Sequence, residues 1–305
     1  PQAVPTFDNQ TLRLNMFLKL GGTALRVKLT NRFATHPLVV GGAHVASRQS
    51  AAGPDIIPET DHGLTFAGAR TLRLDPGKEV WSDPADLAVK QHEDVAVSLF
   101  LPEPTTPEAF HPVGLKTQYI VAGDHCGDAT FSPAGPGSRT TMYFFVSGVQ
   151  VMAPARSKVI VAMGDSITDG AASANDRNAA WPDVLSSRLP ALPDGTPVSV
   201  INMGIGSNRL VSGDAAGPAG LRRLEEDVLS RPNVSHLILL EGINDISYEQ
   251  VPVEKLIAAY EQVIEKAHAR GIKVMGGTLL PIQNSRKDTP ANEATRQAAN
   301  RWIRE

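Results

Sequence analysis

The first half of the chain alternates hydrophobic and polar residues with a period of two, which predicts β-strands. In residues 11–20, leucine and methionine alternate with arginine, asparagine and lysine. Residues 25–29 repeat the alternation, and Gly21-Gly22 between the two runs predicts a β-hairpin. Two further alternating runs follow, at residues 95–101 and 142–152. We expect residues 1–153 to form an all-β, jelly-roll-like sandwich domain.

The pattern changes near Ala153-Pro154, after which short apolar runs alternate with segments of helical spacing. The predicted strands are residues 159–163, 198–202, 235–240 and 272–280. The predicted helices are one with Trp181, Val184, Leu185 and Leu189 on one face, one opened by Pro252 and closed by Gly271, and one capped by Thr289 that runs from Pro290 to Glu305. Apolar strands alternating with helices predict a parallel sheet covered on both faces. We therefore expect residues 157–305 to form an α/β domain.

Composition narrows the function classes. The 305 residues suit two domains, and 42% hydrophobic residues are enough for two cores. A net charge of -3 provides no basic surface for nucleic acid or anionic lipid. No apolar stretch approaches the roughly 20 residues of a membrane span. The single cysteine, Cys126, excludes an internal disulfide, and oligomeric state is left open.

The first residues do not resemble a signal peptide, which fits a mature secreted or periplasmic protein or, alternatively, a cytoplasmic one.

Polar residues gather where three of the predicted strands end: Gly164-Asp165-Ser166, residues 202–208 and residues 241–245. Ligands of parallel sheets bind beyond the carboxyl ends of the strands, so these loops are expected to converge. A serine hydroxyl there can act as a nucleophile if a base accepts its proton and donors stabilise the oxyanion. Two simpler interpretations are a helix N-cap for Ser166 and a turn residue for Asn244.

These residues resemble the SGNH, or GDSL, hydrolases, a family of esterases and lipases with a flavodoxin-like three-layer α/β/α fold. "GDSIT" at 164–168 is similar to the first family block, "NMGIGSN" at 202–208 to the second, and "GIND" at 242–245 to the third. The resemblance implies that Ser166 is the nucleophile. It implies that the Asn244 amide and a backbone N–H near Ser207 (or its neighbour Gly206) are oxyanion donors. No metal or organic cofactor is implied.

One part of the family pattern is missing. The family takes its base from a late Asp-x-x-His block after a fifth strand, but no such block follows Asn244. The only later histidine, His268, lies inside a predicted helix. We expect the missing strand and block to lie beyond residue 305, with natural loss of catalysis as the alternative.

The expected function is that of a serine esterase. It would act on short acyl esters or acetylated carbohydrate, as a small molecule or a polysaccharide, through an acyl-serine intermediate. The alternative is a catalytically inactive carbohydrate-binding or scaffold protein.

Three other features favour structural interpretations. "GDHCGD" at 123–128 is more typical of a surface loop than of a metal site, because no second ligand cluster accompanies it. Trp81 is expected to be a buried residue at a strand end, not a sugar-stacking platform. A solvated helix face is expected for the charged residues Arg222, Arg223, Glu225, Glu226 and Asp227. We expect Asp165 to orient its loop through hydrogen bonds.

Overall fold

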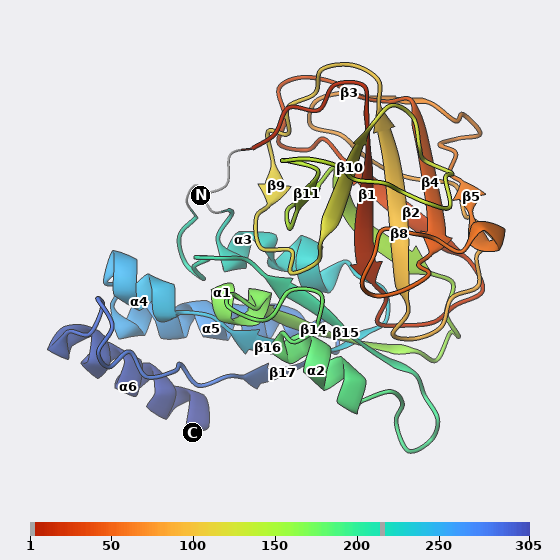
Figure 1. The fold of residues 1–305 in the computed structure, drawn as a ribbon. Coiled ribbons are helices and arrows are strands. Elements are labelled where there is room, and N and C mark those ends of the chain that lie inside the picture. Colours follow the sequence, from red (N-terminus) through yellow and green to blue (C-terminus); the bar gives the residue numbers. More distant parts are fainter. Residues whose placement is uncertain (1–3, 214–216) are drawn as a thin grey trace. The chain divides into compact units, whose positions relative to one another are not determined.

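The structure, a computed structural model, describes residues 4–213 and 217–305. The chain divides into two compact units (Figure 1). Unit 1 comprises residues 1–155 and 174–178, and unit 2 comprises residues 156–173 and 179–305. Within the described residues, no helix has both the length and the apolar character needed to cross a membrane.

Unit 1 pairs its strands in antiparallel fashion throughout the described residues. The strands are β1 (Gln10–Phe17), β2 (Leu25–Thr30), β3 (Leu38–Val40), β4 (Gly42–Ser47), β5 (His62–Gly63), β6 (Leu72–Leu74), β7 (Glu79–Trp81), β8 (Asp94–Leu101), β9 (Phe110–His111), β10 (Gln118–Ala122), β11 (Arg139–Thr140), β12 (Tyr143–Phe144) and β13 (Val146–Val151). The two larger sheets have the orders β11-β10-β1-β8-β4-β5 and β13-β2-β7, and both contribute side chains to one hydrophobic core. The antiparallel strands agree with the expected all-β character, while the jelly-roll-like sandwich stays a prediction.

The predicted hairpin between the first two runs is wrong. Strand β1 pairs with β8 and β10, whereas β2 pairs with β7 and β13 in another sheet. The polar residues of β1 do not face solvent, because Arg13 and Asn15 are fully buried. Strand β1 is therefore an interior strand covered on both faces, and the chain leaves its sheet at Gly21-Gly22.

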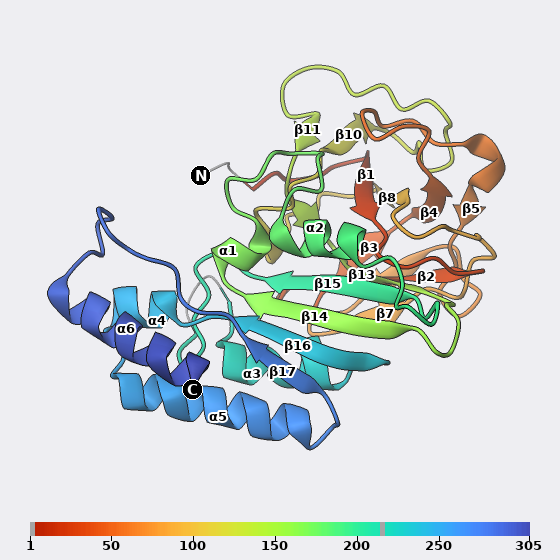
Figure 2. The ribbon, with the colours of Figure 1, turned by 90° about the horizontal axis from the view of Figure 1, so that it is seen from below.

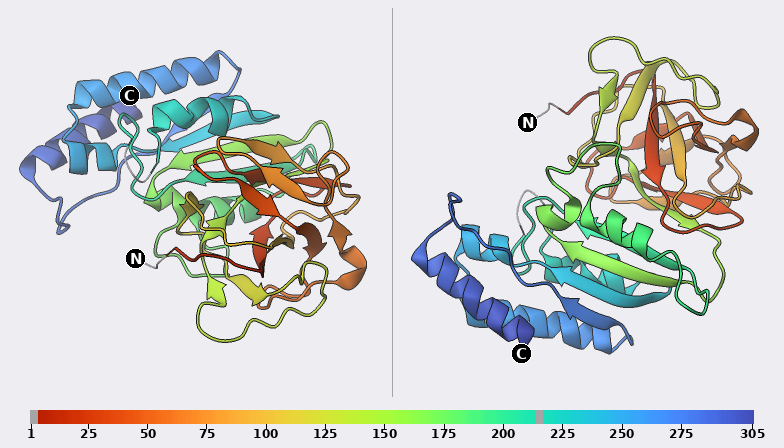
Figure 3. Two further views of the ribbon diagram at one scale, coloured as in Figure 1. Left: turned by 90° about the horizontal axis from the view of Figure 1, so that it is seen from above. Right: turned by 60° about the horizontal axis from the view of Figure 1, so that its bottom comes forward.

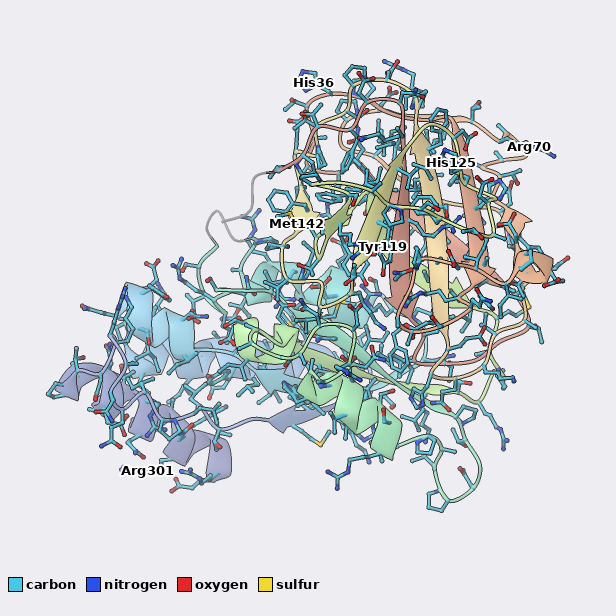
Figure 4. The ribbon with its side chains drawn as sticks, in the orientation of Figure 1. His36, Arg70, Tyr119, His125, Met142 and Arg301 are labelled. Atoms are coloured by element: carbon cyan, nitrogen blue, oxygen red, sulfur yellow. The ribbon has the colours of Figure 1, made fainter. Side chains whose placement is uncertain are left out.

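The loop over β1 is held by Arg13. Its guanidinium donates to the carbonyl oxygens of Pro54, His125, Cys126 and Asp128 at 2.9–3.3 Å, and its Nε donates to Ser98 Oγ at 3.0 Å. Tyr119 on β10 is the register partner of Arg13, and His125 lies in the loop that follows β10; both are labelled in Figure 4. Burial lowers the pKa of Arg13 to about 10 and raises that of the Cys126 thiol. The "GDHCGD" segment is thus a loop tied to the sheet by one buried cation.

Trp81 lies on β7 with its side chain half-buried, and is less enclosed than expected. The Arg26 guanidinium carbon lies 4.6 Å from the centre of a Trp81 ring, a cation–π contact. Arg26 in turn donates to Gln150 Oε1 at 2.7 and 2.9 Å. The indole is therefore part of a packed polar surface on the three-stranded sheet.

Unit 2 contains a parallel sheet of order β15-β14-β16-β17 in its described residues. The strands are β14 (Lys158–Gly164), β15 (Val198–Gly204), β16 (Val234–Leu240) and β17 (Lys273–Gly276). Gly164 pairs in register with Gly204 on one side and Leu240 on the other. The carboxyl ends of these three strands therefore lie level, as the α/β prediction requires.

The helices of unit 2 are α1 (Ser166–Asp169), α2 (Trp181–Arg188), α3 (Gly220–Leu224), a π-helical turn (Glu225–Leu229), α4 (Ile243–Glu249), α5 (Val253–His268) and α6 (Pro290–Arg304). Figures 2 and 3 show α1 and α2 on one face of the sheet and α3 and α5 on the other. Helix α6 packs against α5, where the rings of Tyr260 and Trp302 stack at 5.7 Å.

The predicted helix boundaries are largely confirmed. The Thr289 hydroxyl caps α6 by accepting from the N–H of Asn292 at 3.1 Å, and Pro290 is the first helical residue. Helix α2 is less amphipathic than predicted, because Val184 is 45% exposed. Strand β17 is shorter than the predicted run 272–280, since only Lys273–Gly276 pairs with β16.

Candidate active site

Ser166 is the first residue of α1 and is separated from the end of β14 by Asp165 alone. Its side chain is half-buried. The N-cap is Asp165, whose Oδ1 accepts from the N–H of Ile167 at 2.8 Å. The interpretation of Ser166 as an N-cap is therefore wrong, and the expected orienting role belongs to Asp165. The Ser166 hydroxyl therefore does not cap α1.

Helix α1 lies so close to the ends of β14 and β15 that the last residue of each strand has no room for a side chain. A Cβ added to Gly204 would overlap the backbone of Asp169, and one added to Gly164 would overlap Thr168. Asn202 fixes the same helix, because its Nδ2 donates to the carbonyl oxygen of Thr168 at 2.8 Å. The first and second loops are thus joined by close backbone contact and by the half-buried amide of Asn202.

The second loop presents Ser207 in the left-handed region, with φ = 63°, and its side chain is exposed. Gly206 does not adopt a positive φ, and a Cβ there would find its nearest neighbour 3.7 Å away. The conformation that favours glycine therefore occurs at Ser207. Asn208, which follows, is buried and donates from its Nδ2 to the carbonyl oxygen of Pro218 at 3.0 Å.

The third loop places Asn244 in the first turn of α4, half-buried. Its Nδ2 donates to the backbone carbonyl oxygen of Asn208 at 2.9 Å. An amide nitrogen carries two hydrogens, so this group can donate to one further acceptor. The residue is more than a turn former, because it joins the third loop to the second.

Asp245 strengthens the same junction. Its two carboxylate oxygens accept from the N–H groups of Leu210 and Val211, both at 2.8 Å. The side chain is fully buried, and burial raises the pKa of this carboxyl. Two consecutive residues of "GIND" therefore hold the loop that carries Ser207.

Arg223 contradicts the expectation of a solvated helix face. Its side chain is 4% exposed and lies beneath the three loops, while Arg222 and Glu225 are exposed as expected. It donates to Asn208 Oδ1 (2.9 Å), Met203 O (2.7 Å), Asp227 Oδ2 (2.8 Å), Gly164 O (3.0 Å) and Glu241 Oε2 (3.4 Å). One guanidinium thus reaches the ends of β14, β15 and β16.

The carboxyl groups under the site are poorly solvated. Burial raises the pKa of Asp165 to about 6 and that of Glu241 to about 8, although the Arg223 charge acts in the opposite direction on Glu241. The Tyr260 hydroxyl donates to the carbonyl oxygen of Glu241 at 2.7 Å. The groups next to Ser166 are therefore shielded from water, and hydrogen bonds to a developing negative charge are strengthened where water is excluded.

The three predicted site residues all follow strands at the carboxyl end of the sheet: Ser166 and Asn244 in the first turns of α1 and α4, and Ser207 in the loop after β15. No described histidine of unit 2 accompanies them. His236 is the third residue of β16, and His268 is the exposed last residue of α5. Within the described residues, no group of three or more metal-ligating side chains is arranged around a common point.

Residues 162–305 match the GDSL-like Lipase/Acylhydrolase family. None of the curated proteins compared with the chain matches it. Several solved structures are similar over 48% of this chain. Among them are the SGNH-hydrolase family esterase AlinE4 (21% identity, 73% of that chain, TM-score 0.37), the psychrotrophic esterase EstA from Pseudoalteromonas sp. (17%, 72%, 0.38) and the M. smegmatis aryl esterase (19%, 78%, 0.40).

Proposed function

Residues 162–305 form a GDSL-like lipase/acylhydrolase domain, and from this premise we propose that the protein is a serine esterase that uses Ser166 as its nucleophile. The substrate is a carboxylic ester with a short acyl group, either a small molecule or an acetylated carbohydrate. The alternative of an inactive carbohydrate-binding or scaffold protein is not favoured by any observation on the site.

One arrangement carries the proposal. Ser166 begins α1 at the end of β14 without serving as its cap. Asn244 lies in the first turn of α4, after the end of β16, and its side-chain amide is fixed by Asn208. A nucleophile and an amide donor at neighbouring strand ends are what acyl transfer requires.

The proposed reaction has two stages. Ser166 Oγ attacks the ester carbonyl carbon and loses its proton to a base, and the carbonyl oxygen becomes an oxyanion. The C–O bond then breaks, and the alcohol leaves with that proton. Water hydrolyses the acyl-serine by the same route and restores Ser166. The base is not one of the described histidines of unit 2, since His236 lies within β16 and His268 is the last residue of α5.

Three donors would bind the oxyanion: the backbone N–H groups of Ser166 and Ser207 and the Asn244 amide. The left-handed backbone of Ser207 supports its assignment over Gly206, because the family glycine at this point supplies conformation and an N–H, both of which a serine with φ = 63° retains. The Ser207 hydroxyl has no assigned chemical role.

The test is hydrolysis of p-nitrophenyl acetate by the full-length protein. Ser166→Ala is expected to remove nearly all activity and to prevent labelling by a fluorophosphonate, while the variant's thermal unfolding stays close to that of the wild type. Unchanged hydrolysis or labelling by Ser166→Ala would overturn the assignment of the nucleophile.

A further inference from the structure

Arg223 is bound through every one of its N–H groups. An arginine side chain has five N–H donors in a fixed planar geometry, and the structure gives Arg223 five acceptors. Two of these are the backbone carbonyl oxygens of Gly164 and Met203, at the ends of β14 and β15. The guanidinium therefore sets the spacing between the first and second loops.

A third acceptor links Arg223 to the oxyanion donor. Arg223 Nε donates to Asn208 Oδ1 at 2.9 Å, and the backbone oxygen of Asn208 accepts from Asn244 Nδ2 at 2.9 Å. Asn208 is 1% exposed, and its own Nδ2 is held by the carbonyl oxygen of Pro218. Because each group of Asn208 is bound, its backbone oxygen cannot shift without breaking the contact with Arg223.

Stability alone does not account for this cation. Removing a guanidinium from water is costly, and replacing a buried ionic group by apolar side chains is often neutral or stabilising. Arg223 is 5% exposed, and its contacts to Asp227 and Glu241 account for only two of its five hydrogen bonds. The other three go to the strand ends and to Asn208, which are the groups that shape the site.

We propose that Arg223, acting through Asn208, is a positioning residue that aims the Asn244 amide at the oxyanion. The proposal rests on the proposed esterase function, since it concerns a donor of that reaction. All five N–H groups of Arg223 are bound to protein acceptors other than Ser166 Oγ, so we expect its effect on kcat and not on KM.

The decisive measurement is a double-mutant cycle of Arg223→Met and Asn244→Ala in the full-length protein, with p-nitrophenyl acetate as substrate. A misplaced donor costs about 10–10²-fold, so Arg223→Met is expected to lower kcat by that factor with KM nearly unchanged. If Arg223 acts through Asn244, the double variant should be no more than about threefold slower than Asn244→Ala alone. Multiplying losses would overturn the proposal.

Arg296→Met is the matched control. Arg296 is also a buried arginine of unit 2 that donates to a backbone carbonyl, that of Leu279 in the loop after β17, at 2.8 Å, and it pairs with Glu293. Its substitution should lower stability without coupling to Asn244, so the losses of Arg296→Met and Asn244→Ala should multiply. Coupling of equal size in this control would show a general structural effect and would overturn the proposal for Arg223.

Asn208→Ala keeps the proposal testable if Arg223→Met does not fold. This variant removes the Oδ1 acceptor and keeps the backbone carbonyl. It should therefore lower kcat as Arg223→Met does, and its loss of kcat should not multiply with that of Asn244→Ala. Full kcat in a folded Asn208→Ala would contradict the proposal. Ser166→Ala, measured in parallel, distinguishes failure of the proposed esterase function from failure of the positioning role. If Ser166→Ala stays active, the esterase assignment is wrong. If Ser166→Ala is inactive but the losses of Arg223→Met and Asn244→Ala multiply, only the positioning role is rejected.

Discussion

Asn244 donates from its side-chain amide to the backbone carbonyl of Asn208 across 2.9 Å, so that the third strand-end loop holds the second. The contact uses one of the two amide hydrogens and orients the other. The neighbouring Asp245 binds the N–H groups of Leu210 and Val211. The amide is therefore preorganised before any substrate arrives, which is the condition under which a donor contributes most to catalysis.

Asn244→Ala is expected to lower kcat for p-nitrophenyl acetate by about 10²–10³-fold, the usual effect of losing one oxyanion donor. KM should change little, because the donor acts on charge that develops only in the transition state. Steady-state kinetics measure both values. A loss confined to KM would show that Asn244 binds the ground state and is not an oxyanion donor.

The strand-end blocks of unit 2 could be read from the sequence because each is local. An apolar run followed by "GDSIT" or "GIND" predicts both a strand end and a polar loop within about ten residues. The parallel register then brings these ends level. The hairpin prediction failed for the opposite reason. The partners of β1 are β8 and β10, far along the chain, and alternation alone does not reveal that Arg13 is buried.

Arg223 could not be recognised from the sequence. It stands among Arg222, Glu225 and Asp227, a pattern that is equally typical of a solvated helix face. Its burial follows from acceptors in three separate loops, which only the folded chain brings together. The choice between Ser207 and Gly206 was likewise open, because it depends on a backbone angle that the residue types do not specify.

The raised pKa of Asp165 predicts that the free energy of unfolding depends on pH. Burial raises its pKa from 3.8 to about 6, so the folded state binds more protons than the unfolded state between these values. The stabilisation that protonated Asp165 contributes to the folded state is therefore complete below about pH 4 and is lost as the pH rises through 6. Asp165→Asn keeps the acceptor for the Ile167 N–H and removes the titration.

The measurement is the free energy of unfolding of the wild type and of Asp165→Asn at pH 4 and pH 8. From pH 4 to pH 8, the free energy of unfolding of the variant should rise by about 2–3 kcal/mol relative to that of the wild type, because a pKa difference of one between the folded and unfolded states corresponds to about 1.4 kcal/mol. A constant offset between the two proteins at both pH values would show that Asp165 does not titrate in this range.

Arg13→Met tests the loop of unit 1. Removing the guanidinium leaves the carbonyl groups of Pro54, Cys126 and Asp128 without this donor. Among these residues Cys126 is buried, and an unpaired buried acceptor costs about 1–3 kcal/mol. Faster amide hydrogen exchange is expected in residues 123–131, together with a destabilisation of about 1–3 kcal/mol. Arg26→Met, which removes an exposed arginine of the other sheet, should leave exchange in residues 123–131 unchanged.

Substitutions at Ser207 distinguish the contribution of its backbone N–H to catalysis from that of its hydroxyl. With φ = 63°, a serine is strained by about 1 kcal/mol relative to glycine. Ser207→Gly should therefore keep kcat/KM within about twofold, because the N–H donor and the left-handed backbone both remain. Ser207→Val should lose stability and most of kcat, because a β-branched residue is strongly disfavoured at positive φ. Hydrolysis of p-nitrophenyl acetate and thermal unfolding distinguish the two variants. If Ser207→Gly loses activity as Ser166→Ala is expected to, the serine hydroxyl itself takes part in the reaction and the donor assignment must pass from the backbone to the side chain.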